Sequence, residues 1–278
     1  VGFVPAAHHG DDVVAGRDLW DLFPERLRQG ERIEPFPENA NPQLAYRAGL
    51  ALRGRYDTAL LLYREDIYLP WALGAGIPRR WCLAGRAAPG LLTGEAGGES
   101  RGARGGEDCD IFLSHQRLGT LAGCRPGDFP AGDPFARNED ARAKVEQFVR
   151  KGPAPRLVLA GGVKALSRFW PWERWGEFSA LWKRRHGGST FILDDLAPAG
   201  QPGAAPLPPG KEPPPVSTLP ELLELIRASD LFVGLDGGLA HLAVLAGKPS
   251  VLLFGPGNPA GWGHAHLPGV RIVRSGFP

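Results

Sequence analysis

The sequence of 278 residues contains no methionine and only three cysteines. Cys82, Cys109 and Cys124 are odd in number and lack the spacing of metal ligands, so they favour a reduced, cytosolic setting without a structural metal. Because an initiator methionine is missing, we expect that the chain does not begin at its native start.

Long apolar runs and a strong charge bias are also absent. No run approaches the roughly 20 apolar residues of a transmembrane helix, and no signal peptide is recognisable. Because 32 basic residues face 30 acidic ones, net charge gives no support for nucleic-acid binding. A hydrophobic content of 43% is ordinary for a soluble globular protein, and the length predicts one large or two medium domains.

The first half of the chain alternates short apolar runs with segments of helical spacing. The runs predict strands at Val1–Pro5, Ile33–Phe36, Ala59–Tyr63 and Arg80–Leu83. The helical spacing predicts helices at Asp18–Gln29, Pro42–Arg55, Ile67–Gly74, Asp110–Leu121 and Asn138–Val149, with a loop at Gly85–Asp108.

The second half repeats this alternation after a linker composition at Lys151–Pro155. Strands are predicted at Arg156–Ala160, Phe191–Leu193, Leu231–Leu235 and Ser250–Phe254, and helices at Trp172–Arg185 and Pro220–Ala228, the latter after a Leu196–Val216 loop. Thr218 and Glu221 have the spacing of a capping box. The pattern predicts an α/β fold of two parallel-sheet domains, residues 1–152 and 153–278, with a cleft between them.

The most informative segment is Ser229–Trp262, which reads as strand, glycine turn, helix, strand and glycine turn. The first N–H groups of a helix lack intrahelical partners, and the helix dipole adds positive potential, so such a turn favours an anion. We expect Gly237, Gly238 and Leu239 to present their amides to phosphate, with His241 one turn into the helix. Asp236 is expected to hold this turn as a polar cap, and an ordinary N-cap role is the alternative.

Two further turns belong to the same prediction. In open parallel sheets, ligands bind at the carboxyl ends of the strands. Gly161-Gly162 and Gly255 both follow predicted strands, so Gly162 and Gly255 are candidate donor-site residues. Lys164 and Arg168 come shortly after the first of these turns and could neutralise a pyrophosphate, although two solvated loop charges are the plainer interpretation.

These motifs resemble those of a known family. Asp236–Ala243, Phe254-Gly255-Pro256 and Pro259–Gly263 are similar to the D-[TS]-G-x-x-H-L-A and F-G-P-T-x-P-x-x-W-G motifs of family 9 glycosyltransferases, the heptosyltransferases. Ser167–Trp175 resembles the family's K-x-W-P-x-E-R-[FW] stretch. The resemblance implies a GT-B fold, in which two Rossmann-like, doubly wound domains face a cleft.

The resemblance also implies a function. It implies a cytoplasmic enzyme that could make peripheral contact with the inner face of the membrane. Such an enzyme moves a heptose-like sugar from a nucleotide diphosphate donor, such as an ADP-sugar, to a cell-envelope glycan or glycolipid. The transfer would be inverting and would need neither metal ion nor cofactor. The C-terminal half would bind the donor and the N-terminal half the acceptor.

Departures from the family pattern leave alternatives open. Gly237 and Gly257 stand where the family has hydroxyl residues, and Arg168 replaces a lysine but can still bind phosphate through its fork. The family's catalytic base is an Asp after the first strand, and Asp11 or Asp12 is the local candidate. Alternatively, Val1–Pro5 is the second strand and the catalytic loop is missing.

Two other functions remain compatible with the sequence. A catalytically degenerate nucleotide-sugar-binding protein would explain the lost hydroxyls, and a sugar epimerase of the same fold is a further alternative. Trp170, Trp172 and Trp175 are expected to pack in the core rather than to form a sugar platform.

Overall fold

The computed structural model describes residues 2–3, 31–32, 41–61, 65–83, 94–96, 110–121, 123–125, 132–162, 168–193 and 214–276. The chain divides into two compact units, Val1–Pro130 and Ala131–Pro278. Among the described helices, none combines the length and apolar character that a membrane crossing requires.

The C-terminal unit is built on one parallel sheet of five strands in the order β10-β9-β8-β6-β7. The strands are β6 (Arg156–Ala160), β7 (Ser189–Leu193), β8 (Leu231–Leu235), β9 (Ser250–Phe254) and β10 (Val270–Arg274). From β6 the sheet grows outward in one direction through β7, and in the opposite direction through β8, β9 and β10. The sheet is therefore doubly wound. Its order reverses between β6 and β8, the place where such sheets bind ligands.

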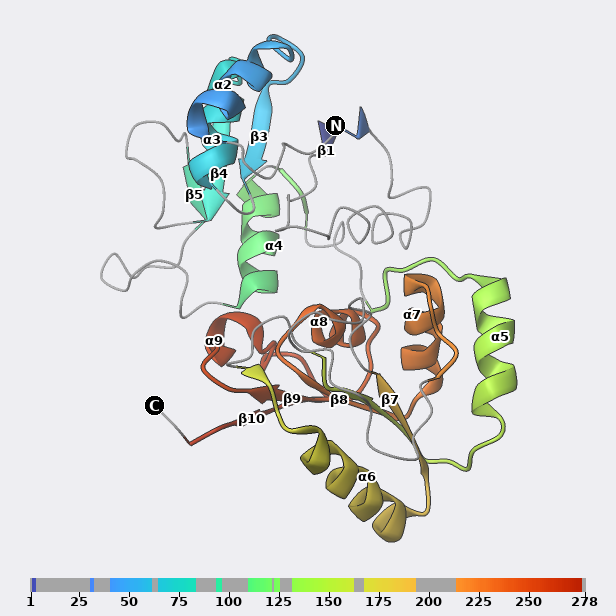
Figure 1. The fold of residues 1–278 in the computed structure, drawn as a ribbon. Coiled ribbons are helices and arrows are strands. Elements are labelled where there is room, and N and C mark those ends of the chain that lie inside the picture. Colours follow the sequence, from blue (N-terminus) through green and yellow to red (C-terminus); the bar gives the residue numbers. More distant parts are fainter. Residues whose placement is uncertain are drawn as a thin grey trace. The chain divides into compact units, whose positions relative to one another are not determined.

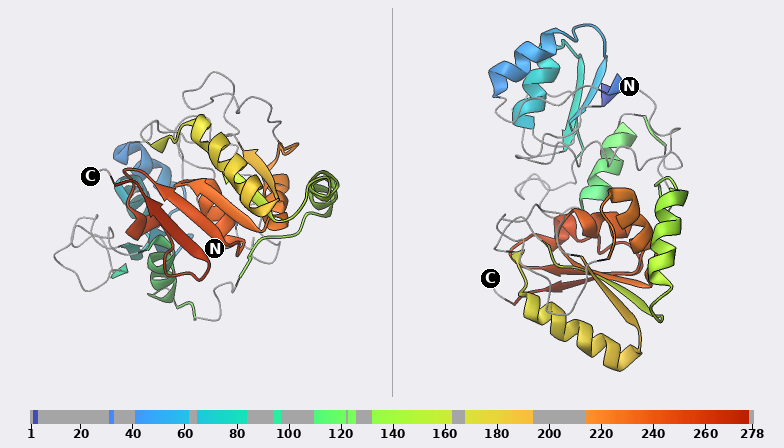
Figure 2. Two further views of the ribbon diagram at one scale, coloured as in Figure 1. Left: turned by 90° about the horizontal axis from the view of Figure 1, so that it is seen from below. Right: turned by 45° about the vertical axis from the view of Figure 1, so that its right-hand side comes forward.

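Helices cover both faces of this sheet (Figures 1 and 2). Helix α6 (Trp172–His186) lies on one face, and α5 (Glu139–Val149), α7 (Leu219–Ala228) and α8 (Gly238–Leu245) lie on the other. The four-residue helix α9 (Pro259–Trp262) follows β9. Because both faces are covered, the inner strands β6, β8 and β9 are mainly apolar runs, as the sequence predicted.

The tryptophans of α6 form the core beneath the sheet. Trp175 is fully buried and Trp172 is 5% exposed, and both pack against Leu157 and Val233 from the strands. Trp170 stands edge-on to Trp175, with ring centroids 4.8 Å apart. The prediction that these tryptophans pack in the core is therefore confirmed.

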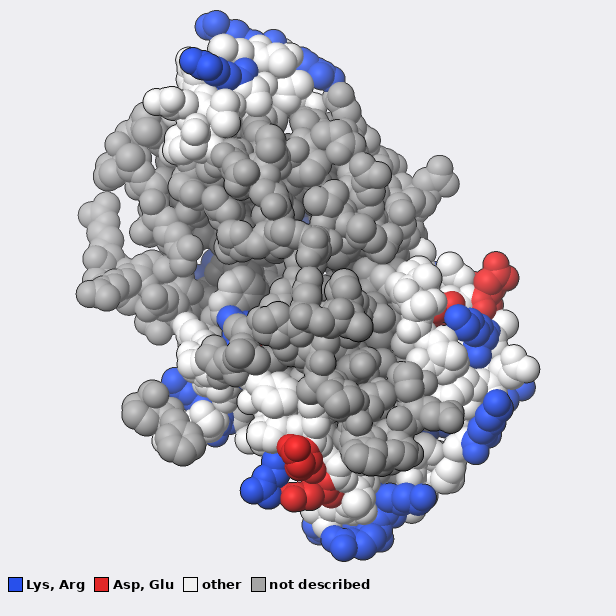
Figure 3. Space-filling view, in the orientation of Figure 1, with Lys and Arg blue, Asp and Glu red and all other residues white. Residues whose placement is uncertain are grey.

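The basic residues of α6 lie at its carboxyl end. Its last turn contains Lys183, Arg184, Arg185 and His186, and Figure 3 shows Lys and Arg atoms gathered over this end. Positive side chains there complement the negative end of the helix dipole. Gly187 then ends the helix with a left-handed conformation, φ 70°.

Helix α7 begins with the predicted capping box. The Thr218 side chain accepts a hydrogen bond from the Glu221 backbone, and the Glu221 carboxylate accepts one from the Thr218 N–H. The same carboxylate also accepts from the Ser217 N–H at 2.7 Å and from Lys144 Nζ on α5 at 2.6 Å. Burial alone would raise the pKa of Glu221, but the hydrogen bonds from Lys144 and Ser217 outweigh it and lower the pKa to about 2.

The N-terminal unit contains two smaller parallel sheets. One pairs β1 (Gly2–Phe3) with β2 (Glu31–Arg32), and the other has the order β3 (Thr58–Leu61), β4 (Arg79–Leu83) and β5 (Gly94–Ala96). The helices described in this unit are α2 (Pro42–Leu50), α3 (Glu65–Gly74) and α4 (Ile111–Leu121). Asp18–Gln29 and Ile33–Phe36 lie outside the described residues.

Helices α2 and α3 approach closely enough to require glycine. A Cβ on Gly49 would lie 2.1 Å from the Trp71 carbonyl oxygen, and one on Gly74 would lie 2.0 Å from that of Tyr46. Asn41 caps α2, which ends at Leu50 rather than at the predicted Arg55 because the chain then turns through residues 51–54.

Three described elements were not predicted from the sequence. Gly94–Ala96 is a strand inside the predicted Gly85–Asp108 loop, although it has no apolar signal, because its backbone pairs with β4. Pro259–Trp262 is a short helix where only a turn was predicted, and Val270–Arg274 is an edge strand that was not predicted. Of that strand only Val270 is buried, so it lacks the continuous apolar run of its neighbours.

The unit boundary also differs from the predicted division after residue 152. Helix α5 precedes the Lys151–Pro155 linker, yet its Phe148 packs on Phe191 of β7 with ring centroids 5.5 Å apart. Arg142 and Glu146 of α5 face α7 across a small cavity. These contacts place α5 in the C-terminal unit, and the roles of the two units in binding acceptor and donor stay predictions.

The capping box gives a test of pH-dependent stability. At pH 7, E221Q should lower the free energy of unfolding by about 1–3 kcal/mol, because the native state favours the ionised carboxylate. The pKa of Glu221 is lower in the folded chain than its ordinary value of 4.5, so its contribution is present above that pH and is lost as pH falls toward about 2. Urea unfolding followed by tryptophan fluorescence should therefore show a difference that shrinks between about pH 5 and pH 2.

E173Q on the exposed side of α6 is the matched control, and it should change stability little at any pH. A difference between E221Q and the parent chain that stayed constant over the same pH range would contradict the role given to the ionised carboxylate.

Candidate functional site

The candidate site lies where the order of the C-terminal sheet reverses. Ala160 of β6 is paired in register with Gly234 of β8, so the residues that follow, Gly161-Gly162 and Leu235-Asp236, leave the sheet next to each other. A Cβ on Gly161 would lie 2.8 Å from both Trp172 and Trp175, so this glycine is required by packing. Gly162 is half-buried at the end of β6.

Helix α8 begins directly after β8, and its first amides point to the chemistry of the site. Gly237 is the N-cap and its carbonyl accepts from the N–H groups of Ala240 and His241. The N–H groups of Gly238 and Leu239 come before these bonds and have no acceptor within the helix. Gly238 is exposed and a Cβ there would meet no atom within 4 Å, so an anion can approach this turn.

Asp236 does not cap α8 and instead forms an ion pair. The N-cap position belongs to Gly237, and no side chain caps the helix, which corrects the predicted capping role of Asp236. The Asp236 N–H still donates to Leu253 in the sheet at 3.1 Å, which holds the residue at the end of β8. Its carboxylate lies 3.3 Å from the Arg168 guanidinium.

The two partners of this ion pair differ in exposure. The Asp236 side chain is 9% exposed and that of Arg168 is 44% exposed. Burial raises the pKa of Asp236, and the positive charge of Arg168 and the His264 ring oppose that rise. Arg168 is therefore held at one end by a buried carboxylate while much of its side chain remains open to solvent or to an anion.

Gly257, in the turn after β9, packs against the same carboxylate. A Cβ on Gly257 would lie 2.7 Å from Asp236 Oδ2 and 3.4 Å from the Phe254 ring. The absence of a side chain at position 257 thus provides the space that the Asp236 carboxylate occupies. Gly255, in the same turn, is half-buried.

A pair of histidines completes the described part of the site. His241 Nδ1 lies 2.7 Å from Nε2 of His264, and the two rings meet edge to face with centroids 5.0 Å apart. His264 is fully buried and follows α9, and the Trp262 ring lies 5.8 Å from that of His241. The motif analysis ended at Gly263 and missed His264, because nothing in the sequence links it to His241.

The structure brings together part of the predicted set. Eight of the predicted residues lie at the carboxyl ends of β6, β8 and β9. They are Gly162, Arg168, Asp236, Gly237, Gly238, Leu239, His241 and Gly255. Lys164, Asp11 and Asp12 lie outside the described residues. The role of each of these residues in binding or catalysis stays a prediction.

Comparison with known proteins gives one sequence match in this region. Residues 212–275, which contain β8, α8, β9 and the Asp236–His264 cluster, match the model of "Glycosyltransferase family 9 (heptosyltransferase)". The resemblance to family 9 glycosyltransferases is confirmed. So is the prediction that the chain is a glycosyltransferase. A search of curated proteins finds no match.

Solved structures support the predicted fold of this chain. A family 9 glycosyl transferase from Veillonella parvula DSM 2008 is similar with a TM-score of 0.62 and 15% identity, over 93% of this chain and 75% of that chain. The ADP-heptose LPS heptosyltransferase II of E. coli has a TM-score of 0.54 and 20% identity, over 91% of this chain and 78% of that chain. At such identities the likeness establishes the fold, and it confirms the predicted α/β, GT-B class.

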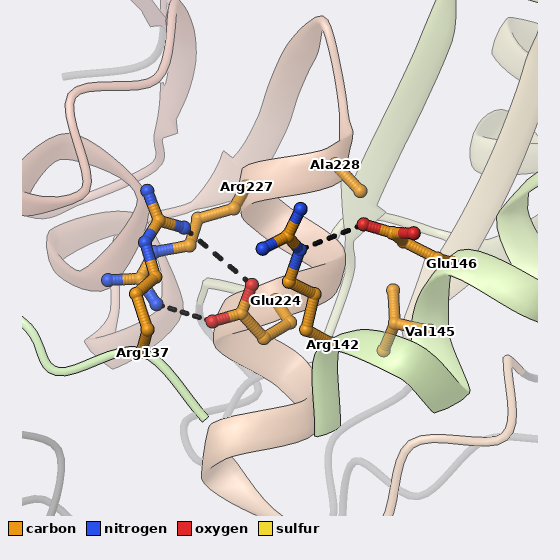
Figure 4. A pocket seen from close by; sticks show the side chains of 7 residues that line it. All are labelled: Arg137, Arg142, Val145, Glu146, Glu224, Arg227 and Ala228. Atoms are coloured by element: carbon orange, nitrogen blue, oxygen red, sulfur yellow. Dashed lines mark hydrogen bonds and ion pairs between the residues drawn. The ribbon is translucent and has the colours of Figure 1, made fainter. Parts of the chain in front are cut away.

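A cavity of about 300 Å³ between α5 and α7 is a separate feature of the C-terminal unit (Figure 4). Arg227 and Glu224 are buried in its wall, 2.6 Å apart, and Arg137 adds a second cation 3.7 Å from Glu224. Arg227 also binds Asp133 and the carbonyl oxygen of Phe135. The charged side chains that line this cavity pair with one another. We therefore interpret them as contacts that hold residues 133–137 against α7, and not as a ligand site.

The contact between Gly257 and Asp236 can be tested by a double-mutant cycle. G257A should lower the free energy of unfolding by about 1–3 kcal/mol, because the new methyl group displaces the buried carboxylate from Arg168. In a D236A background the same substitution should cost much less, since the displaced group is gone. Urea unfolding of the four proteins measures both values, and an equal cost in both backgrounds would contradict the contact.

Proposed function

We propose that this chain is an inverting, metal-independent glycosyltransferase that moves a heptose-like sugar from a nucleotide diphosphate donor, such as an ADP-sugar, to a cell-envelope glycan. The observation that carries the donor half of the proposal is the open amino end of α8 at the sheet's switch point, with Arg168 beside it. The family match over residues 212–275 supports the class of reaction.

The donor diphosphate would bind at the first turn of α8. The amides of Gly238 and Leu239 and the helix dipole favour negative charge, and the Arg168 guanidinium adds a full positive charge with a fork suited to phosphate oxygens. His241, one turn along the helix, is the third group that could donate to a phosphate or to the sugar. Asp236 would keep Arg168 in place rather than bind the donor.

The reaction would proceed by in-line displacement. An acceptor hydroxyl attacks the anomeric carbon and a carboxylate base takes its proton. The bond between the anomeric carbon and the phosphate oxygen breaks, and the diphosphate leaves from the opposite face with that electron pair. Asp11 or Asp12 is proposed as that base. Charge develops on the leaving phosphate, where Arg168 and the α8 amides stabilise it, so the positive groups of the protein suffice without a metal ion.

Removal of the Arg168 guanidinium tests the donor site. R168A should raise the dissociation constant for ADP by about 10–100-fold, which corresponds to the loss of a charge-assisted hydrogen bond, and should lower turnover at least as much. R168K retains the charge without the fork and should lose less. Isothermal titration calorimetry measures the binding of ADP to each protein.

R174A is the matched control, because Arg174 is an exposed arginine paired with Glu177 on α6. Unchanged ADP affinity and turnover in R168A would remove Arg168 from the donor site. Tight ADP binding by the parent chain without turnover of any donor would favour the degenerate nucleotide-sugar-binding protein instead.

A further inference from the structure

His264 combines three features that the proposed reaction does not explain. It is fully buried, its backbone adopts a positive φ of 54°, and its Nε2 lies 2.7 Å from Nδ1 of His241. Non-glycine residues rarely adopt this conformation, so the surrounding structure must hold it in place. Its ring also lowers the pKa of Asp236, against the effect of burial, and so favours the carboxylate's charge.

The distance between the two rings restricts their protonation. Two ring nitrogens at 2.7 Å share one proton, because two N–H groups facing each other would repel and neither would have an acceptor. The pair can therefore carry at most one positive charge. It follows that Nδ1 of His241 is hydrogen-bonded to His264, and that Nε2 is the ring atom through which His241 would contact a donor phosphate.

We propose that His264 is a positioning residue of the donor site, which through its hydrogen bond fixes the ring orientation and proton position of His241 beside the first turn of α8. This inference rests on the proposed donor site. When His264 donates, His241 is neutral and carries its proton on Nε2. When His241 is the cation, it donates from both nitrogens, to His264 and to the phosphate. A neutral His241 that donated from Nδ1 would leave Nε2 without a proton, facing the phosphate lone pairs, so the proposal requires one of the first two states.

A purely structural role for His264 makes the opposite prediction for two substitutions. The amide nitrogen of glutamine lies at the distance of histidine Nε2, so H264Q can still donate to His241 Nδ1. The shorter asparagine places its amide at the position of Nδ1 and cannot reach. Asparagine, however, tolerates positive φ better than glutamine. A hydrogen-bonding role thus ranks H264Q above H264N, and a backbone role ranks H264N above H264Q.

The experiment measures ADP binding by calorimetry and the melting temperature of the parent chain, H264Q, H264N, H241A and R168A. We expect H264Q to weaken ADP binding by about three-fold and H264N by about ten-fold or more, close to H241A. H264N should nevertheless melt at the same or a higher temperature than H264Q. H266Q, an exposed histidine of the same segment, is the control and should bind ADP like the parent chain.

The outcomes separate the inference from the proposed function. If R168A loses affinity but H264N binds ADP as well as H264Q or better, His264 is not a positioning residue while the donor site stands. If the parent chain does not bind ADP, the proposed donor site is wrong and the inference falls with it.

A second measurement covers variants that do not fold. In the parent chain with ¹⁵N-labelled histidine, two-bond ¹H–¹⁵N spectra report the proton position on each ring, and H241Q assigns the signals. A proton on His241 Nε2 is expected, with Nδ1 hydrogen-bonded to His264, and a fixed neutral tautomer with the proton on Nδ1 alone would overturn the inference. Rapid exchange of His241 between both neutral tautomers, as in a solvated ring, would overturn the inference.

Discussion

The buried carboxylate of Asp236 is the constraint on which the rest of the candidate site depends. Strand β8 carries it to the carboxyl end of the sheet, where its own N–H still bonds to Leu253. Burial disfavours its charge, and Arg168 and His264 offset that cost. Because an ionised group is kept there more easily with such partners, the carboxylate constrains where the Arg168 guanidinium and the His264 ring lie.

The same constraint relates two departures from the family pattern. Gly257 leaves the space that the carboxylate fills, since a Cβ there would lie 2.7 Å from Oδ2. Gly237 leaves the amino end of α8 without a side-chain cap. The loss of two hydroxyl groups is thus accompanied by a carboxylate that holds Arg168 and by an open helix end. On this view the glycines change how an anion is bound at the site rather than remove the site.

Much of the C-terminal sheet could be predicted from the sequence, because its strands are buried on both faces. The bounds of Arg156–Ala160, Leu231–Leu235 and Ser250–Phe254 agree with the structure for this reason. The capping box of Thr218 and Glu221 was recognisable because its residue types and spacing are local. The glycine turns after these strands were likewise placed at the correct edge of the sheet.

What could not be predicted depends on contacts between distant residues. The sequence predicted Asp236 as the cap of α8, since an Asp before a helix often caps it. In the structure its carboxylate instead pairs with Arg168 and fills the space beside Gly257. His264 is twenty-three positions from His241 in the sequence, and its role is visible only where the two rings meet. The edge strand Val270–Arg274 has one buried residue and therefore little hydrophobic signal.

The central claim is that the amino end of α8 binds the diphosphate of a nucleotide donor. Titration of ADP into ¹⁵N-labelled protein, with backbone amides assigned, tests it most directly. The account predicts the largest amide shifts at Gly238 and Leu239, which saturate together with the binding curve. Saturable ADP binding that leaves these two amides unchanged would contradict it.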